Sequence, residues 1–479
     1  MCLTSVAYGA DVAHGDRIPW RVEDPLRLIG LVDCGGIMLR LPRRLPVAAL
    51  IILLVAALLA AALTVVLSRP ASAEPGTPLS YPAGAAATRF TGAAFDTCTA
   101  PSLSAVKAWS ASRYRAIGVY IGGYRSCSQP RLTGGWVGEL TKRGWRLLPI
   151  YVGRQAPCAD RRFRYVISTT TAAAAQGADA AAAAASKARA LGFLAGSGIY
   201  LDIEHYDSTD SACRTAVIRY ISGWTKQLHR QGYLAAVYIN TAGAKQLVQT
   251  YSSRTYARPD AIWLARWDGS ASLVGWSGVP SNKWAVHQRA KQYRGDHYES
   301  YGGVSLRIDT DRIDAPVASV AFPYRVTANG LRARTGPGTS HSVVRVLPKG
   351  AAIRVVCRTR GTKISTTSVW DKLTDGSYVS DFYVSTPART SYPVPPRQCT
   401  YPYQVTSGTG LYQRTGPGLS YRTAGGLPSG SLAWVVCQRS GSKVGTTRVW
   451  DKLANGRWVS DHYVATPSTT GYSKPVPRC

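Results

Sequence analysis

Short apolar segments alternate with longer segments of helical length between residues 88 and 320. The apolar runs are almost uncharged and span residues 116–121, 147–152, 199–203, 234–239 and 261–265. Runs this short and this apolar are typical of strands that are covered on both faces. The intervening segments, 102–111, 135–144, 172–191 and 211–231, are long enough for helices. The alternation predicts a parallel α/β fold, and a length of about 230 residues matches a (β/α)8, TIM-like barrel.

The C-terminal part of the chain is a duplicated unit. A shift of 80 residues aligns 331–338 with 411–418, 369–373 with 449–453, and 378–381 with 458–461. Each copy has short β-branched and aromatic runs between Gly/Pro turns, which predicts a small all-β barrel. We therefore expect three folded regions, at residues 88–320, 322–399 and 401–479.

A candidate secretory signal precedes these regions. An uncharged apolar run, residues 47–67, follows three arginines at 40, 43 and 44 and precedes the small residues 71–73. These are the parts of a signal peptide spanning 38–73, with cleavage after Ala73. An uncleaved anchor is the alternative, because the run is long enough to span a bilayer. Met38 lies two residues before the first of these arginines, so translation is expected to start there. Residues 1–37 are therefore interpreted as a misassigned extension.

Cysteine usage agrees with export. Eight of the ten cysteines follow Ala73, and an even number in an oxidising compartment predicts disulfides. Within each repeat two cysteines are 42 residues apart: Cys357 and Cys399, then Cys437 and Cys479. Three pairings are open to the four cysteines of the first region, and strand adjacency favours Cys98 with Cys127 and Cys158 with Cys213. No CxxC or HxxxH spacing accompanies them, so neither a metal nor another cofactor is expected.

The net charge of +31 predicts a polyanionic partner. The segment up to Ala73 carries seven Arg and five acidic residues, so its removal leaves +29 on the remaining chain. Export favours peptidoglycan or another anionic wall polymer over nucleic acid. Membrane contact is expected only through an uncleaved signal segment, and a monomer is expected. The predicted location is secreted and associated with the cell wall.

Four carboxylates are expected at one end of the barrel. Asp96 follows the first strand, Asp202 and Glu204 lie near the end of the fourth, and Asp309 lies in the last. In barrel enzymes, the ends of several strands supply the catalytic groups. Side chains two apart on a strand point to the same side, so Asp202 and Glu204 should share a site. A protonated Glu beside an ionised Asp is the pair that glycosidic cleavage requires.

The order of motifs resembles a known family. The segments 95–96, 200–204, 237–240, 262–267, 284–288 and 308–311 resemble the family 25 glycoside hydrolases, and still more the secreted glycoside-hydrolase-like domain of unknown function 1906. The resemblance implies that Glu204 is the proton donor and that Asp202 stabilises the reacting centre. It also implies that Asp96 and Asp309 complete the acidic floor. For these two, helix capping or pairing with a barrel Arg is the alternative.

Aromatic and amide side chains supply candidate substrate contacts. Trp263 and Trp267 could stack on sugar rings or could fill the barrel. Tyr238 and Gln288 are predicted to contact substrate, Tyr238 by hydrogen-bonding a substrate amide or a catalytic carboxylate.

The repeats resemble bacterial SH3 domains through their Arg-Thr-Gly-Pro-Gly turns at 334–338 and 414–418. This resemblance implies wall binding, with Trp370, Tyr378, Trp450 and Trp458 as candidate contacts and core packing as the alternative for each Trp.

Two functions follow from these patterns. The leading hypothesis is a secreted hydrolase of a cell-wall glycan, held on the wall by its SH3-like repeats. The alternative is a wall-glycan-binding barrel with little or no turnover.

Overall fold

The computed structural model describes residues 85–124, 127–160, 163–387, 396–468 and 470–479. All of them belong to one compact unit, Thr77–Cys479. The predicted extension 1–37 and signal segment 38–73 lie outside the described residues. Within the described part of the chain, no helix is both long and apolar enough to cross a bilayer.

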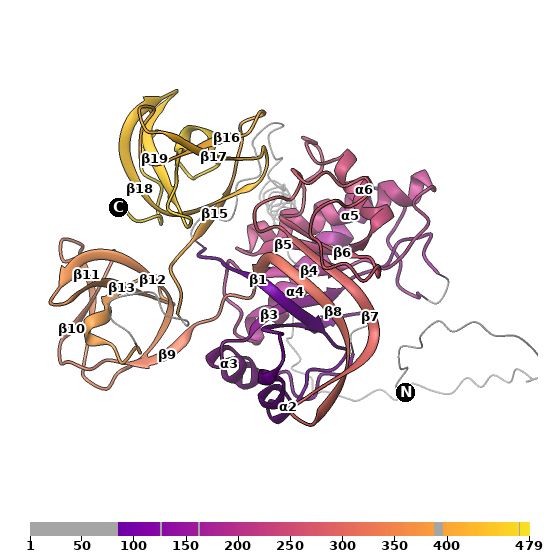
Figure 1. Ribbon diagram of the computed structural model, residues 1–479, viewed down its shortest axis with the longest axis horizontal. Helices are drawn as coiled ribbons and strands as arrows, with labels where there is room; N and C mark the ends of the chain where they lie inside the picture. Colours follow the sequence, from indigo (N-terminus) through magenta and orange to yellow (C-terminus); the bar gives the residue numbers. More distant parts are fainter. Residues whose placement is uncertain (1–84, 125–126, 161–162, 388–395, 469) are drawn as a thin grey trace, which may run out of the picture. The chain divides into compact units, whose positions relative to one another are not determined.

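Eight strands close into a barrel in chain order (Figure 1). Strands β1 to β7 all run parallel to one another. Strand β8 closes the barrel between β7 and β1 and is antiparallel to both. Their bounds are β1 Thr88–Asp96, β2 Ala116–Gly123, β3 Arg146–Val152, β4 Gly198–Asp202, β5 Leu234–Asn240, β6 Ala261–Ala265, β7 Arg289–Tyr301 and β8 Val304–Val317. The five predicted apolar strands are therefore confirmed to within about two residues.

Helices follow each of the first five strands. They are α2 Leu103–Ala108, α3 Gly134–Lys142, α4 Ala172–Ala190, α5 Ser211–Arg230 and α6 Thr241–Gln249. Four of them begin where a side-chain oxygen accepts a free backbone N–H of the first turn. The capping residues are Ser102, Thr133, Asp210 and Asn240. The four predicted helices are confirmed, and α6 is an additional one.

The predicted (β/α)8 barrel is wrong in its last quarter. Residues 266–288, between β6 and β7, contain no helix and are rich in Gly and Ser, which are poor helix formers. Strands β7 and β8 are joined at Gly302 and Gly303, whose φ angles of 57° and 77° suit glycine. A turn this tight leaves no room for a crossover helix. The result is an eight-stranded mixed barrel rather than a TIM barrel.

Side chains fill one end of the barrel interior. Tyr200, Trp263 and Ile313 are buried there with several small alanines, and Tyr200 donates to the carbonyl of Pro316 at 2.7 Å. A second apolar layer lies between the strands and helices and includes Phe95, Trp109, Trp145 and Trp224. The polar side chains described below therefore stand on a packed floor at the opposite end.

Each repeat forms a six-stranded antiparallel sheet, which confirms its all-β character. The first contains β9 Phe322–Arg325, β10 Leu331–Arg334, β11 Val343–Leu347, β12 Ala352–Ile364, β13 Thr367–Leu373 and β14 Tyr378–Ser380. The second contains β15 Tyr401–Gln404, β16 Leu411–Arg414, β17 Thr423–Leu427, β18 Leu432–Val444, β19 Thr447–Leu453 and β20 Trp458–Ser460. The expected disulfides, Cys357–Cys399 and Cys437–Cys479, are present.

A buried arginine lies between two aspartates in the first repeat. Arg358 Nε donates to Asp371 at 3.1 Å, and its terminal nitrogen lies 3.1 Å from Asp381. Thr386 also donates to Asp381 at 2.6 Å. All three charged side chains are fully buried. A buried charge needs a partner of opposite sign, and here one cation serves both carboxylates.

The second repeat replaces this cation with a neutral amide. Gln438 occupies the position equivalent to Arg358 and donates to Asp451 at 2.8 Å and to Asp461 at 3.0 Å. Burial, together with the charge of Asp461, raises the pKa of Asp451 well above its usual range. Burial raises the pKa of Asp461 from 3.8 to about 7. Such carboxyls favour the folded state when protonated, so the second repeat loses stability as the pH rises from about 4 through about 7.

We expect the second repeat to be more sensitive to pH than the first. Hydrogen exchange of the intact chain, corrected for intrinsic rates, should show protection in 401–479 falling about tenfold or more between about pH 5 and about pH 8. Burial, then the charge of Asp381, also raises the pKa of Asp371 in the first repeat, where the charge of Arg358 opposes the rise. Gln438→Arg should therefore reduce the fall in the second repeat, and Arg358→Gln should enlarge the smaller fall in the first. Equal pH dependence of the two wild-type repeats would contradict the assignment.

Candidate active site

Three aspartates meet where β1 pairs with β8. Asp96 is the last residue of β1 and lies opposite Asp309 in the register, while Ala94 lies opposite Asp311. Asp309 and Asp311 are two apart on β8 and therefore point to the same side. Asp96 and Asp311 are almost completely buried, at 1% and 0% exposure. The antiparallel last strand thus brings distant carboxylates together beneath the open end of the barrel.

Burial beside one another raises the pKa values of these carboxyls. Burial, then the charge of Asp309, raises the pKa of Asp96 well above its usual range. Burial likewise raises the pKa of Asp309. For Asp311 burial is again the main cause of a raised pKa, followed by the charges of Asp96 and Asp309.

Asp202 and Glu204 lie at the end of β4 in different surroundings. Asp202 is the last residue of the strand and is 5% exposed, whereas Glu204 is exposed and follows the strand. The sequence analysis expected both side chains to be oriented by one strand, but Glu204 lies beyond the end of β4, so strand geometry does not set its orientation. The buried amide of Gln155 fixes it instead, donating to the carbonyl of Asp202 at 3.0 Å and accepting from the Glu204 N–H at 2.8 Å. Gln155 is a positioning residue that the sequence analysis missed.

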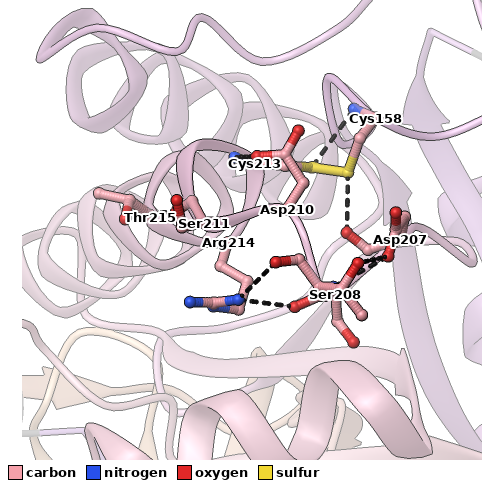
Figure 2. The surroundings of a disulfide bond; sticks show 9 residues. Cys158, Asp207, Ser208, Asp210, Ser211, Cys213, Arg214 and Thr215 are labelled. Carbon is pink, nitrogen blue, oxygen red and sulfur yellow. Dashed lines mark hydrogen bonds between the residues drawn. A yellow bond between two sulfur atoms is a disulfide. The ribbon is translucent and has the colours of Figure 1, made fainter.

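A disulfide stabilises the loop that follows Glu204 (Figure 2). Cys158, after β3, is bonded to Cys213 in the first turn of α5, as predicted. The loop between Glu204 and α5 is tied to this bridge, because Cys158 Sγ contacts the carbonyl of Asp207 at 3.1 Å. Arg214 donates to the carbonyls of Ser208 and Thr209 at 3.0 and 2.9 Å. The other predicted bridge, Cys98–Cys127, joins the loops after β1 and β2.

Gln292 on β7 joins three parts of the site. Its amide nitrogen donates to Asp96 at 2.9 Å. Its oxygen accepts from the Tyr238 hydroxyl at 2.9 Å and from the Trp267 indole at 2.8 Å. Burial, then the charges of Glu204 and Asp202, raises the pKa of Tyr238 well above its usual range, so its hydroxyl remains a donor.

Trp267 presents an open aromatic face. The side of the ring toward β7 lies so close to Gly295 that a Cβ there would be 2.2 Å from the indole. Trp267 is nevertheless 64% exposed. The absence of a side chain at Gly295 thus lets the ring lie against the strand while the rest of it remains accessible to ligand.

A pocket of about 270 Å³ lies among these residues. Glu204, Tyr238 and Trp267 line it together with Ile203, His205, Asn240 and Ala265. Asn240 both caps α6 and bonds His205 at 3.0 Å, so it supports that side of the pocket. The arrangement offers an accessible carboxyl, a flat aromatic surface and a buried acidic floor.

Two predicted substrate contacts are wrong. Trp263 is 1% exposed and donates to Asp311 at 3.0 Å inside the barrel, so its ring cannot stack on a sugar. Gln288 precedes β7 and donates to the carbonyl of Asp260 at 2.6 Å, at the end of the barrel away from the pocket. Asp311 and Gln292 were missed. The signal available in the sequence was their spacing, because residues two apart on a strand face the same side. Asp311 is two residues from Asp309 on β8, and Gln292 is two residues from Ala290 on β7.

The aromatic residues predicted to bind the wall are buried. Trp370, Tyr378, Trp450 and Trp458 are all at most 8% exposed, as expected for the alternative of core packing. Trp370 and Trp450 donate their indole N–H to the carbonyls of Thr362 and Ser442, each at 2.9 Å. The edge of Trp370 also lines a pocket in the first repeat.

The role of Gln155 can be tested without an activity assay. In Gln155→Leu both hydrogen bonds to the segment 202–204 are lost, at a net cost of about 1 kcal/mol each. We expect the amide of Glu204 to exchange about tenfold faster in hydrogen-exchange measurements, with the fold retained. Gln176→Leu is the control. Gln176 lies on α4, and its side-chain oxygen accepts a comparable hydrogen bond from the Ser168 N–H. Unchanged protection of Glu204 in Gln155→Leu would reject the positioning role.

Residues 107–313 match the sequence profile of the Rv2525c-like, glycoside hydrolase-like domain. Similar solved structures include an uncharacterized protein of B. stearothermophilus, with 19% identity, 47% of this chain and 99% of that chain covered, and a TM-score of 0.35. The Tat-secreted protein Rv2525c of Mycobacterium tuberculosis, solved with L-tartrate, has 15% identity, coverage of 47% and 96%, and a TM-score of 0.34. A family 25 glycosyl hydrolase from Bacillus anthracis has 12% identity, coverage of 48% and 93%, and a TM-score of 0.29. No curated protein matches the chain. The profile match shows that most of the barrel, residues 107–313, is similar to the Rv2525c-like, glycoside hydrolase-like domain.

Proposed function

We propose that the barrel hydrolyses a glycosidic bond in a cell-wall glycan, with Glu204 as the proton donor. The observation that supports this most is the position of Glu204 at a pocket shared with Tyr238 and Trp267. An accessible carboxyl can reach the bridging oxygen of a bound sugar, and the indole can stack on a neighbouring ring. The match of residues 107–313 to a glycoside hydrolase-like domain supports the same class of reaction.

The reaction divides between the two carboxyls at the end of β4. Glu204 gives its proton to the leaving oxygen as the bond between that oxygen and the anomeric carbon breaks. Asp202, buried beside the pocket, stabilises the positive charge that develops at the sugar. Water then adds to the anomeric carbon and its proton returns to Glu204. The amide of Gln155 keeps the two groups in register through these steps.

The buried acidic floor has a supporting role. Asp96 fixes Gln292, and Gln292 in turn fixes the Tyr238 hydroxyl and the Trp267 indole. Asp309 raises the pKa of Asp96 through its charge. We assign Asp96 and Asp309 to positioning and electrostatics rather than to direct proton transfer.

Glu204→Gln should abolish the release of reducing ends from purified walls and leave wall binding intact. The substitution keeps the shape of the side chain but removes the transferable proton. Glu139→Gln is the matched control, because Glu139 lies on the outer helix α3 with its carboxylate paired to Lys142 at 2.8 Å. Equal release by wild type and Glu204→Gln would exclude the assignment. Binding without soluble products from the wild type at any pH would support the alternative, a non-catalytic glycan-binding barrel.

We further propose that the C-terminal repeats are SH3-like modules that hold the protein on the wall. Four disulfides are typical of a chain that folds in an oxidising, extracellular compartment. The net charge of +31 suits the anionic polymers of a wall. The regions 322–399 and 401–479 are the boundaries that we propose for these modules, with 88–320 for the barrel.

Deletion of residues 322–479 should weaken association with purified walls. Cosedimentation of the full chain and the truncated chain, both carrying Glu204→Gln to prevent digestion, measures the effect. We expect a loss of about tenfold or more, because two binding modules on one chain reinforce each other. Unchanged cosedimentation would reject the anchoring role and leave the proposed reaction untouched.

A further inference from the structure

The first repeat contains a groove of about 260 Å³ that the fold does not explain. One wall comes from β10, which contributes Arg332 and Arg334. The other wall includes the edge of Trp370 on β13, Ser380 on β14 and Tyr383. Aromatic surfaces and cations thus face the same space.

Ser380 is the sharpest feature of this groove. It is 4% exposed, yet its hydroxyl has no hydrogen-bond partner among the described residues. A buried hydroxyl left unpaired destabilises the folded state, so unpaired groups of this kind are rare without a reason. A ligand in the groove that offers a hydrogen-bonding group would satisfy this hydroxyl.

The two arginines differ in how much of their capacity is already used. Arg334 donates to the carbonyl of His341 at 2.7 Å, which ties it to the neighbouring turn. The side chain of Arg332 is exposed and makes no hydrogen bond or ion pair with any residue that the structure describes. One unengaged guanidinium matches the single charge of a carboxylate, which it can bind in a bidentate manner.

The second repeat acts as an internal comparison. It keeps Arg414, Trp450, Ser460 and Tyr463 at the equivalent positions, and the hydroxyl of Ser460 is likewise buried without a described partner. However, Tyr412 stands where the first repeat has Arg332, and it is 69% exposed. The second repeat thus shares these lining residues with the first, while this exchange puts an aromatic ring in place of the free cation.

We propose that the groove of the first repeat binds a peptide that carries a free carboxylate. Arg332 binds the carboxylate, and the Ser380 hydroxyl donates a hydrogen bond to a peptide carbonyl. The peptide lies against Trp370 and Tyr383. The second repeat lacks this preference because Tyr412 offers no charge. This assignment rests on the wall-binding function proposed above and names the group on the wall that the first repeat recognises.

The test uses the full chain carrying Glu204→Gln and two forms of one probe. The probe is purified peptidoglycan freed of phosphate-containing polymers, either untreated or with its carboxylates converted to amides. We expect amidation to weaken binding about fivefold or more. Arg332→Tyr, which copies the second repeat, should weaken binding to the untreated form and remove the dependence on carboxylates. Tyr412→Arg should increase that dependence.

Two further variants keep the test interpretable. Arg448→Tyr removes the same charge from an exposed position on β19 of the second repeat, and it should retain the carboxylate dependence. Ser380→Ala removes only the unpaired hydroxyl and should weaken binding while the melting temperature stays unchanged or rises. If Arg332→Tyr behaves like Arg448→Tyr, or if binding requires the phosphate-containing polymers, the assignment is overturned. Loss of binding on deletion of 322–479 in that case would still support anchoring.

Discussion

The pairing of β1 with an antiparallel β8 is the constraint on which the rest of the barrel depends. It closes the sheet, and through its register it sets Asp96 opposite Asp309 with Asp311 one pleat away. Three carboxyls could not all ionise in a space this well buried. The raised pKa values of Asp96 and Asp311 relieve part of this problem, because they favour the neutral forms of these carboxyls. The acidic floor is therefore compatible with a folded barrel.

Two neutral amide side chains, Gln292 and Gln155, connect the buried carboxyls to the residues that line the pocket. Gln292 and Gln155 each have a donor and an acceptor, so each can bridge two unlike groups without adding charge. Gln292 extends from Asp96 to Tyr238 and Trp267, and Gln155 extends across the backbone from Asp202 to Glu204. A Lys or Arg at either position would pair with the carboxylates and lower their pKa values. The choice of glutamine thus adds no cation that would oppose the raised pKa values of the buried aspartates.

The sequence predicted the parts of this site that follow from local pattern. Apolar runs located the strands, the length of the segments between them located the helices, and strand ends located Asp96, Asp202 and Glu204. The antiparallel β8 was missed because a hairpin through Gly302 and Gly303 leaves no trace in the apolar periodicity. Gln155 was missed for a different reason: it is bound to β4 residues about 50 positions away, and only the tertiary fold brings them together. Trp263 was misassigned because alternation on a strand cannot tell the barrel interior from its mouth.

The duplication separates what the small sheets need in order to fold from what they need in order to bind. Both copies keep the aspartate pair, the turn arginine and the buried indole, so these residues belong to the architecture. The exchanges lie elsewhere and differ in kind. Arg358 against Gln438 changes the charge of a sealed interior, which alters stability and leaves the surface unchanged. Arg332 against Tyr412 changes the charge of an open groove, where the fold gains nothing from either residue. Since a surface residue without intramolecular contacts contributes little to stability, the second exchange reflects a difference in ligands rather than in folding.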